Sequence, residues 1–106
     1  MAKYLISGSY TVEGIKGVLK EGGTGRRNAV EAAVKSMGGR LEAFYFAFGD
    51  NDVFGIADVP DNVTAATFSM GIAATGTVRT RTTVLLTPEE IDQATKKVLA
   101  FRAAGQ

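Results

Sequence analysis

The sequence has 106 residues, of which 45% are apolar and 22% charged, and its formal net charge is +1. These values predict one globular domain, residues 1–106, and the balanced charge gives no general electrostatic attraction to nucleic acid or to an anionic membrane, so we expect neither partner. Because the chain has no cysteine and no histidine, we expect no cofactor, no thiolate or imidazole catalysis, and none of the usual zinc or haem ligands.

The first predicted strand covers residues 3–10, where side chains alternate between two faces. One face carries Leu5, Ser7 and Ser9, and the other carries Tyr4, Ile6 and Tyr10. Thr11 is the predicted N-cap of a helix that stops at Gly22-Gly23, and a second helical piece runs from near Thr24 to Gly38-Gly39. The two pieces could form one broken helix. Their predicted core-facing residues are Val12, Ile15, Val18 and Leu19, followed by Val30, Ala33, Val34 and Met37.

The second half of the chain predicts a hairpin, a helix, a strand and a final helix. Residues 41–48 and 53–59 are β-prone runs separated by the polar turn Gly49-Asp50-Asn51-Asp52. Asp61 is the predicted cap of a helix ending near Gly76, and residues 77–86 form the fourth strand. Thr87 and Glu90 form a capping box with Pro88 between them, which predicts a last helix with apolar positions through Phe101.

This order of elements predicts an α+β domain with the ferredoxin-like βαββαβ arrangement. The expected architecture is an antiparallel four-stranded sheet with helices on one face, followed by a C-terminal helix.

The predicted hairpin is apolar on both faces. Alternation in its first strand places Phe44, Phe46 and Phe48 opposite Leu41, Ala43, Tyr45 and Ala47. Alternation in its second strand places Phe54 and Ile56 opposite Val53, Ala57 and Val59. Helices cover only one face in this topology, so the other face must meet the last helix or a second subunit. We therefore expect the chain to associate with itself, as a homodimer or a larger closed homo-oligomer.

A family resemblance is carried by Tyr10-Thr11, by Leu19 to Gly23, by Gly38-Gly39 with Leu41 to Gly49, and by Thr82 to Thr87. In these segments and in their order, the chain resembles the GYD-domain proteins over nearly its whole length. The resemblance implies a ferredoxin-like fold related to the dimeric α/β barrels. It implies no particular activity, because that family has no generally established one and fold alone does not decide function.

At the hairpin turn, Asp52 matches the family's motif, whereas Asn51 stands where a tyrosine is expected. A role that depends on a phenol at this turn is therefore not expected here. The wider barrel superfamily includes cofactor-free monooxygenases, lactone isomerases and haem enzymes, and the lack of histidine argues against the haem branch.

The glycine-rich segment Gly22 to Arg27 is the first candidate ligand site. Free N–H groups and the helix dipole at a helix start favour an anion, and Arg26 and Arg27 would add positive charge. Arg26 lies one turn before Val30, a position that suits the mouth of a pocket. The alternative is a helix break whose arginines pair with surface acids.

Asp50 and Asp52 are the second candidate site. Two neighbouring carboxylates could bind a ligand, transfer a proton or hold a hard metal ion, although local hydrogen bonding in the turn explains them equally well, and we assign no metal site. Arg79 and Arg81 share one face of the fourth strand, where they could line an anionic pocket, protect a sheet edge or pair across a subunit interface.

Two functional hypotheses follow for the whole chain. The first is a self-associating domain that binds a small anionic or aromatic metabolite between sheet and helices, near Arg26, Arg27 and Tyr45. The alternative is a cofactor-independent monooxygenase or isomerase acting on a small hydrophobic substrate, with Tyr45 or Asp52 moving the proton and Arg26 holding an enolate. Tyrosines and phenylalanines could line the cavity, or could simply pack in the core. Without a secretory signal, the expected location is the cytoplasm.

Overall fold

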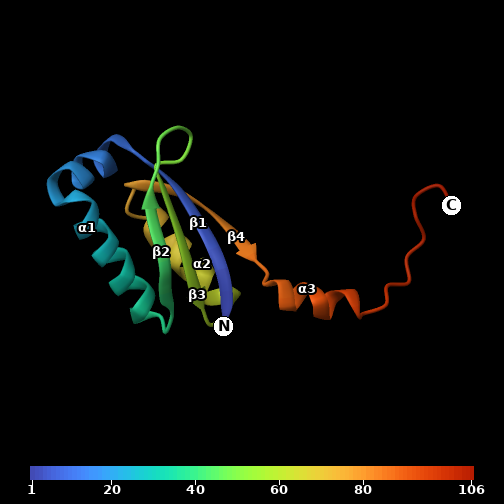
Figure 1. The fold of residues 1–106 in the computed structure, drawn as a ribbon. Helices are drawn as coiled ribbons and strands as arrows, with labels where there is room; N and C mark the ends of the chain where they lie inside the picture. The colour runs from blue at the N-terminus through green and yellow to red at the C-terminus, as the bar shows by residue number, and fades with distance from the viewer.

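A computed structural model describes all 106 residues of the chain. The elements follow the order β1 (Ala2–Tyr10), α1 (Val12–Ser36), β2 (Arg40–Phe46), β3 (Val53–Val59), α2 (Asn62–Ala73), β4 (Val78–Leu85) and α3 (Pro88–Thr95). The strands form one antiparallel sheet in the order β2-β3-β1-β4, and α1 and α2 pack on the same face of it (Figure 1). The predicted α+β, ferredoxin-like arrangement with a C-terminal helix is therefore confirmed.

Each helix begins at the cap that the sequence predicts. The side chain of Thr11 accepts a hydrogen bond from the Gly14 N–H at 3.2 Å, and Asp61 accepts one from the Thr64 N–H at 2.8 Å. Thr87 and Glu90 form a reciprocal capping box at the start of α3. These side chains satisfy N–H groups that have no partner inside the helix, and so fix where each helix starts.

The predicted break at Gly22-Gly23 is a kink inside one helix. Gly22 has φ 80° and ψ 168°, a backbone conformation that glycine adopts without the steric penalty of a Cβ. After the kink, Val30 and Val34 pack on the sheet. Before it, the helix turns away from the sheet, so the predicted core positions Val12 and Ile15 are exposed. That part of the predicted core is wrong.

A β-bulge changes the predicted alternation in β2. Leu41 lies opposite Ala57, but Ala43 lies opposite Ile56, so the register shifts between Leu41 and Ala43. Because the bulge adds one residue to β2, Leu41 faces the helices together with Phe44 and not the opposite side. The helix-facing surface thus gains a large side chain that strict alternation assigned to the other face.

The core lies between α1, α2 and the sheet. Its buried members are Tyr4, Val34, Leu41, Ala57, Val59, Ala65 and Phe68. Only 12 of the 106 residues are buried, which is few for a chain of this length and indicates that much apolar surface remains uncovered.

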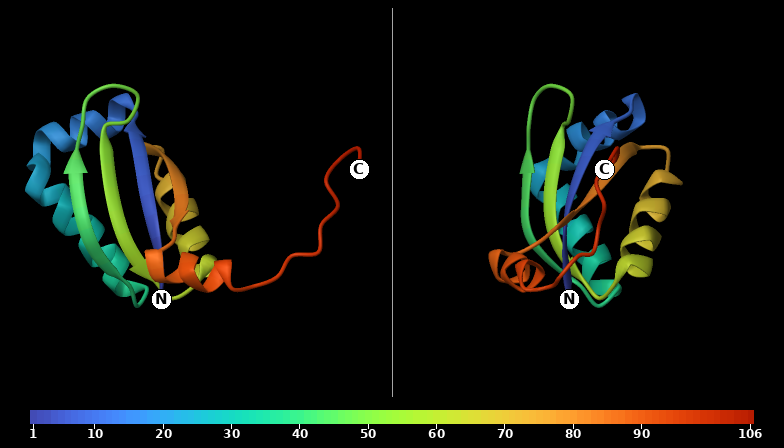
Figure 2. Two further views of the ribbon diagram at one scale, coloured as in Figure 1. Left: turned by 45° about the vertical axis from the view of Figure 1, so that its right-hand side comes forward. Right: turned by 90° about the vertical axis from the view of Figure 1, so that its right-hand side faces the viewer.

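The opposite side of the sheet, the open face, is covered by no helix of the chain. Its apolar side chains are Leu5, Ala43, Tyr45, Phe54, Ile56 and Leu85, all partly or fully exposed. The C-terminal helix α3 does not cover this face, because it and the residues after it extend away from the body (Figure 2). None of the helices is both long and apolar enough to cross a membrane.

Candidate functional site

A cavity of about 120 Å³ lies between the sheet and the two packed helices. It is lined by the residues Ile6, Gly8, Tyr10, Arg26, Val30, Leu41, Phe44, Val53, Gly55, Phe68, Ile72, Thr75, Thr77, Val78 and Thr80. Nine of these fifteen residues are hydrophobic, and all four strands and both packed helices contribute. Apolar walls with few polar groups are typical of small-molecule sites.

One glycine creates part of this space. Gly8 and Gly55 both face the helices from the two central strands, but a Cβ added at Gly8 would lie only 2.9 Å from Val78 Cγ2, so free volume remains at Gly55 and not at Gly8. A Cβ added at Gly55 would lie 3.6 Å from the Phe44 ring, an ordinary contact, so a small amount of free volume exists there. The cavity therefore follows from the sequence of the strands as well as from the placement of the helices.

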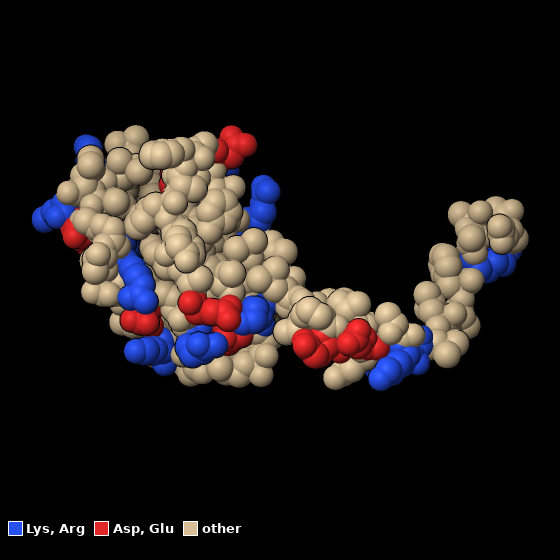
Figure 3. All heavy atoms as spheres, viewed as in Figure 1, with Lys and Arg blue, Asp and Glu red and all other residues tan.

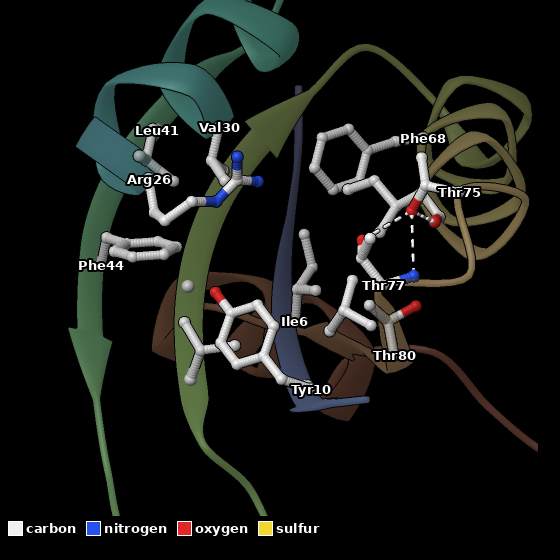
Figure 4. A pocket seen from close by; sticks show the side chains of 15 residues that line it. Ile6, Tyr10, Arg26, Val30, Leu41, Phe44, Phe68, Thr75, Thr77 and Thr80 are labelled. Carbon is white, nitrogen blue, oxygen red and sulfur yellow. Dashed lines mark hydrogen bonds between the residues drawn. The ribbon is translucent and has the colours of Figure 1, made fainter. Parts of the chain in front are cut away.

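The polar groups of the cavity lie on two sides of it (Figure 4). Arg26 and Tyr10 point into it from α1 and from the end of β1, and three threonines lie across from them. The Thr75 hydroxyl donates to the Ile72 carbonyl oxygen at 2.6 Å and lies 2.7 Å from the Thr77 hydroxyl. The hydroxyls of Thr75 and Thr77 are thus already hydrogen-bonded within the protein.

Arg26 keeps free donors at the cavity. One of its nitrogens, Nη1, lies 3.2 Å from Glu21 Oε2, and this is its single ion pair. A guanidinium group carries five N–H donors and remains charged at all physiological pH values. Arg26 can therefore pair with Glu21 and still donate to a ligand.

Tyr10 is protonated at neutral pH. Burial raises the pKa of its hydroxyl, and the nearby Arg26 guanidinium opposes that rise, while Asp52 and Glu21 add to it. The Tyr10 backbone N–H donates to Asp52 Oδ2 at 2.8 Å, which fixes the end of β1 beside the hairpin turn. Tyr10 is therefore a positioned O–H donor next to a guanidinium group.

Asp52 supports the site without lining it. Its carboxylate accepts the Tyr10 N–H, its own N–H donates to the Gly8 carbonyl at 2.7 Å, and its carbonyl accepts the Ala47 N–H at 2.9 Å. These bonds account for the side chain and backbone of Asp52 as parts of the turn. Sequence reasoning had proposed it as a ligand or proton-transfer group.

The other predicted site residues lie away from the cavity. Arg27 is exposed and lies 3.9 Å from Glu31 in an i,i+4 pair. Tyr45 is 70% exposed on the open face, the side of the sheet opposite the cavity. Asp50 lies in the hairpin turn, within a polar depression on the open face that also includes Arg79 and Arg81. Of the predicted set, only Arg26 lines the cavity.

Asp50 and Asp52 do not belong to any group of three or more acidic side chains that could hold a metal ion. Sequence reasoning did not single out Thr75 and Thr77 as site residues. Both lie in the connection between α2 and β4, where they read as ordinary turn residues. No local pattern distinguishes them, because they reach the cavity only through the packing of α2 on β4.

Comparison with known proteins identifies the family of the chain. The GYD domain family model matches residues 4–95, which extend from β1 to the end of α3. No curated protein and no solved structure matches the chain. Since the matched region covers the sheet, the packed helices and every residue that lines the cavity, the chain belongs to the GYD domain family.

Proposed function

We propose that this domain binds a small aromatic molecule with a negatively charged group in the cavity between sheet and helices. The observation that carries the proposal is an apolar cavity in which Arg26 and Tyr10 supply the free polar donors at one end. A carboxylate or enolate would accept hydrogen bonds from both, while the ring would contact the apolar wall.

The cavity volume limits the size of the ligand. A closed apolar cavity of about 150 Å³ accommodates benzene, and this cavity is about 120 Å³. It is not fully enclosed, so a polar substituent can extend toward Arg26. A cavity smaller than the one that holds benzene admits no more than one aromatic ring, and Arg26 favours an acidic substituent, so we infer that the ligand is a single-ring aromatic acid.

We further propose that the domain associates with itself, as a homodimer or a larger closed oligomer. Support comes from the open face, where Tyr45, Phe54 and Ile56 belong to an apolar surface that no segment of the chain covers. Contiguous apolar surface of this kind is typical of protein interfaces. The ligand proposal does not depend on this association, since all cavity-lining residues come from one chain.

The enzymatic alternative, a cofactor-independent monooxygenase or isomerase, has less support. Neither Tyr45 nor Asp52 lines the cavity, so the proposed proton-transfer groups would not reach a substrate there. Tyr10 and Arg26 are the ionisable groups of the cavity, and both are protonated at neutral pH. They can hold an anion, but neither is suited to abstract a proton.

The test is a calorimetric titration of benzoate into the wild-type protein and two variants. Arg26→Ala should weaken benzoate binding at least about tenfold, because it removes a charge-assisted hydrogen bond. Arg27→Ala is the matched control, since the neighbouring arginine is exposed and lies away from the cavity. The affinity of this variant for benzoate should stay within about twofold of the wild-type affinity. Benzyl alcohol should bind more weakly than benzoate to the wild type. Equal affinities of both variants for benzoate would contradict the proposal.

A further inference from the structure

The C-terminal arm, residues 86–106, lies outside the body of the domain. It includes α3, which makes no extensive contact with another element, and a following segment without regular structure (Figure 1). The radius of gyration is 17.0 Å and the long axis is 57 Å, whereas a compact chain of this length has a radius of about 13 Å. The arm accounts for this elongation.

The arm combines exposed apolar side chains with a short helix, and both are typical of a segment that packs against another protein surface. Val98, Leu99 and Phe101 are 97%, 81% and 75% exposed. The helix α3 has a full capping box and proline at its start, yet it is only 8 residues long, and isolated helices of that length are marginal in water. Such a helix needs a partner surface to remain folded.

The exposed surface of the chain is large enough for an interface. The solvent-accessible area is 7511 Å², and a compact monomer of this mass exposes about 5,700 Å². The excess is roughly 1,800 Å², which is more than the roughly 800 Å² that each partner contributes to a standard protein interface. One copy therefore has the spare surface that a stable dimer requires.

Charges on the arm and on the sheet complement each other. Arg79 and Arg81 lie in the depression on the open face and have no carboxylate within 4.0 Å, because all five ion pairs of the chain involve other residues. Glu89 and Asp92, both in α3, are likewise unpaired. Figure 3 shows acidic atoms gathered on α3, with basic atoms following toward the C terminus.

Within one chain, the arginines of β4 and the acidic side chains of α3 lie too far apart to pair. Arg79 lies at the start of β4, and the arm leaves from Leu85 at its other end. Six residues of strand separate the two positions by about 20 Å, and the arm continues away from the sheet (Figure 2). A second copy in the opposite orientation can place its acidic helix α3 beside the arginines of the first copy.

We propose that the arm of one subunit docks on a second copy of the chain, with the acidic part of α3 against the partner's Arg79 and the partner's Arg81. The apolar end of the arm then covers exposed surface of the same partner. This inference rests on the proposed self-association and specifies which segments meet. Both arms make the same contact, as two-fold symmetry requires.

The test is charge exchange between two full-length variants, followed by native mass spectrometry and sedimentation. The sheet variant is R79E/R81E, and the arm variant is E89K/D92K. Each should dimerise at least about tenfold more weakly than the wild type, because like charges meet in its homodimer. An equimolar mixture should form the 1:1 heterodimer at near wild-type affinity, since both contacts then join opposite charges.

The control separates this contact from an effect of net charge. The variant K16E/K20E reverses two exposed lysines of α1 that have no ion pair, and it changes the net charge as much as R79E/R81E does. It should dimerise like the wild type, and mixing it with the arm variant should not restore association. Circular dichroism is used to check that each variant is folded. If R79E/R81E does not fold, the salt dependence of the wild-type dimer replaces it, with at least about tenfold weakening expected between 50 and 500 mM salt.

The possible failures are distinguishable. A wild-type protein that is monomeric at about 100 μM overturns self-association and the arm contact together. A stable dimer that is insensitive to both charge reversals, or to salt, overturns the arm contact and leaves self-association in place. Weakening by both reversals without recovery in the mixture also overturns the contact between subunits.

Discussion

Tyr10 joins the candidate site to the stability of the fold. Its hydroxyl points into the cavity beside Arg26, while its backbone N–H is bound by the Asp52 carboxylate. Burial disfavours the phenolate and so raises the Tyr10 pKa above its ordinary value of 10.0. The same environment that keeps Tyr10 a hydrogen-bond donor therefore makes the folded state sensitive to alkaline pH.

The sign of this sensitivity follows from the direction of the shift. A pKa raised by folding contributes stability that is complete below the unfolded pKa and is lost as pH rises through the folded pKa. Urea unfolding of the wild type should therefore show a falling free energy of unfolding above about pH 10. Tyr10→Phe should show a smaller fall, because the titrating group is gone. An identical pH profile for the two proteins would contradict the assignment.

Lys3 contributes in the same alkaline range. Hydrogen bonds to Glu42 and Asp58 raise its pKa, so its contribution is also lost as pH rises. For this reason the profile of Tyr10→Phe keeps part of its slope, and comparison with Lys3→Met separates the two groups.

The elements are fixed in place at a few close contacts, and the start of α1 is the clearest. The Thr11 N–H donates to the Thr77 carbonyl at 2.9 Å, and a Cβ added at Gly14 would lie 1.9 Å from the same oxygen. The first turn of α1 therefore lies directly against the residue that precedes β4. Only glycine permits this approach.

Two glycine substitutions in α1 test this contact. Gly14→Ala should destabilise the protein by about 1–3 kcal/mol, because the added methyl forces the backbone of α1 away from Thr77. Gly17→Ala is the matched control, since no atom lies within 4 Å of its added Cβ, and it should stabilise the helix by about 0.5–1 kcal/mol. Chemical unfolding measures both. A Gly14→Ala protein as stable as the wild type would show that the contact is not maintained in solution.

The same elements show how far the sequence alone leads. Caps, glycines and alternation predicted the strands, the helix starts and the broken helix, because these signals are local. The bulge in β2 was missed, since it depends on pairing with β3, and α3 ends at Thr95 and not near Phe101. The first half of α1 was predicted to pack on the core, but its kink at Gly22 directs it elsewhere.

The candidate site was predictable only in part, because local signals place residues within one element but do not show which elements pack together. Arg26 could be placed at a pocket mouth because its spacing from Val30 on one helix is fixed. Alternation also placed Tyr45 on the face opposite Phe44, and the structure agrees, so Tyr45 cannot share a cavity with Arg26. The threonines of the cavity come from a distant connection whose position is set by packing.

At the scale of the whole molecule, self-association predicts that thermal stability depends on protein concentration. Dimer formation stabilises the folded state by mass action. A tenfold increase in concentration should raise Tm by about 3 °C for a chain of this size. Differential scanning calorimetry at several concentrations measures the change. A Tm that stays constant across a hundredfold range would contradict the proposed oligomer.

The edge strand β4 presents Thr80 to the cavity, Arg79 and Arg81 to the opposite side, and continues into the arm. A displacement of β4 would therefore move its cavity-lining threonine, its two arginines and the arm together. We therefore expect the proposed ligand binding and the proposed self-association to be thermodynamically linked. Whatever factor a bound aromatic acid imposes on the dimer constant, dimerisation must impose on the affinity for that acid.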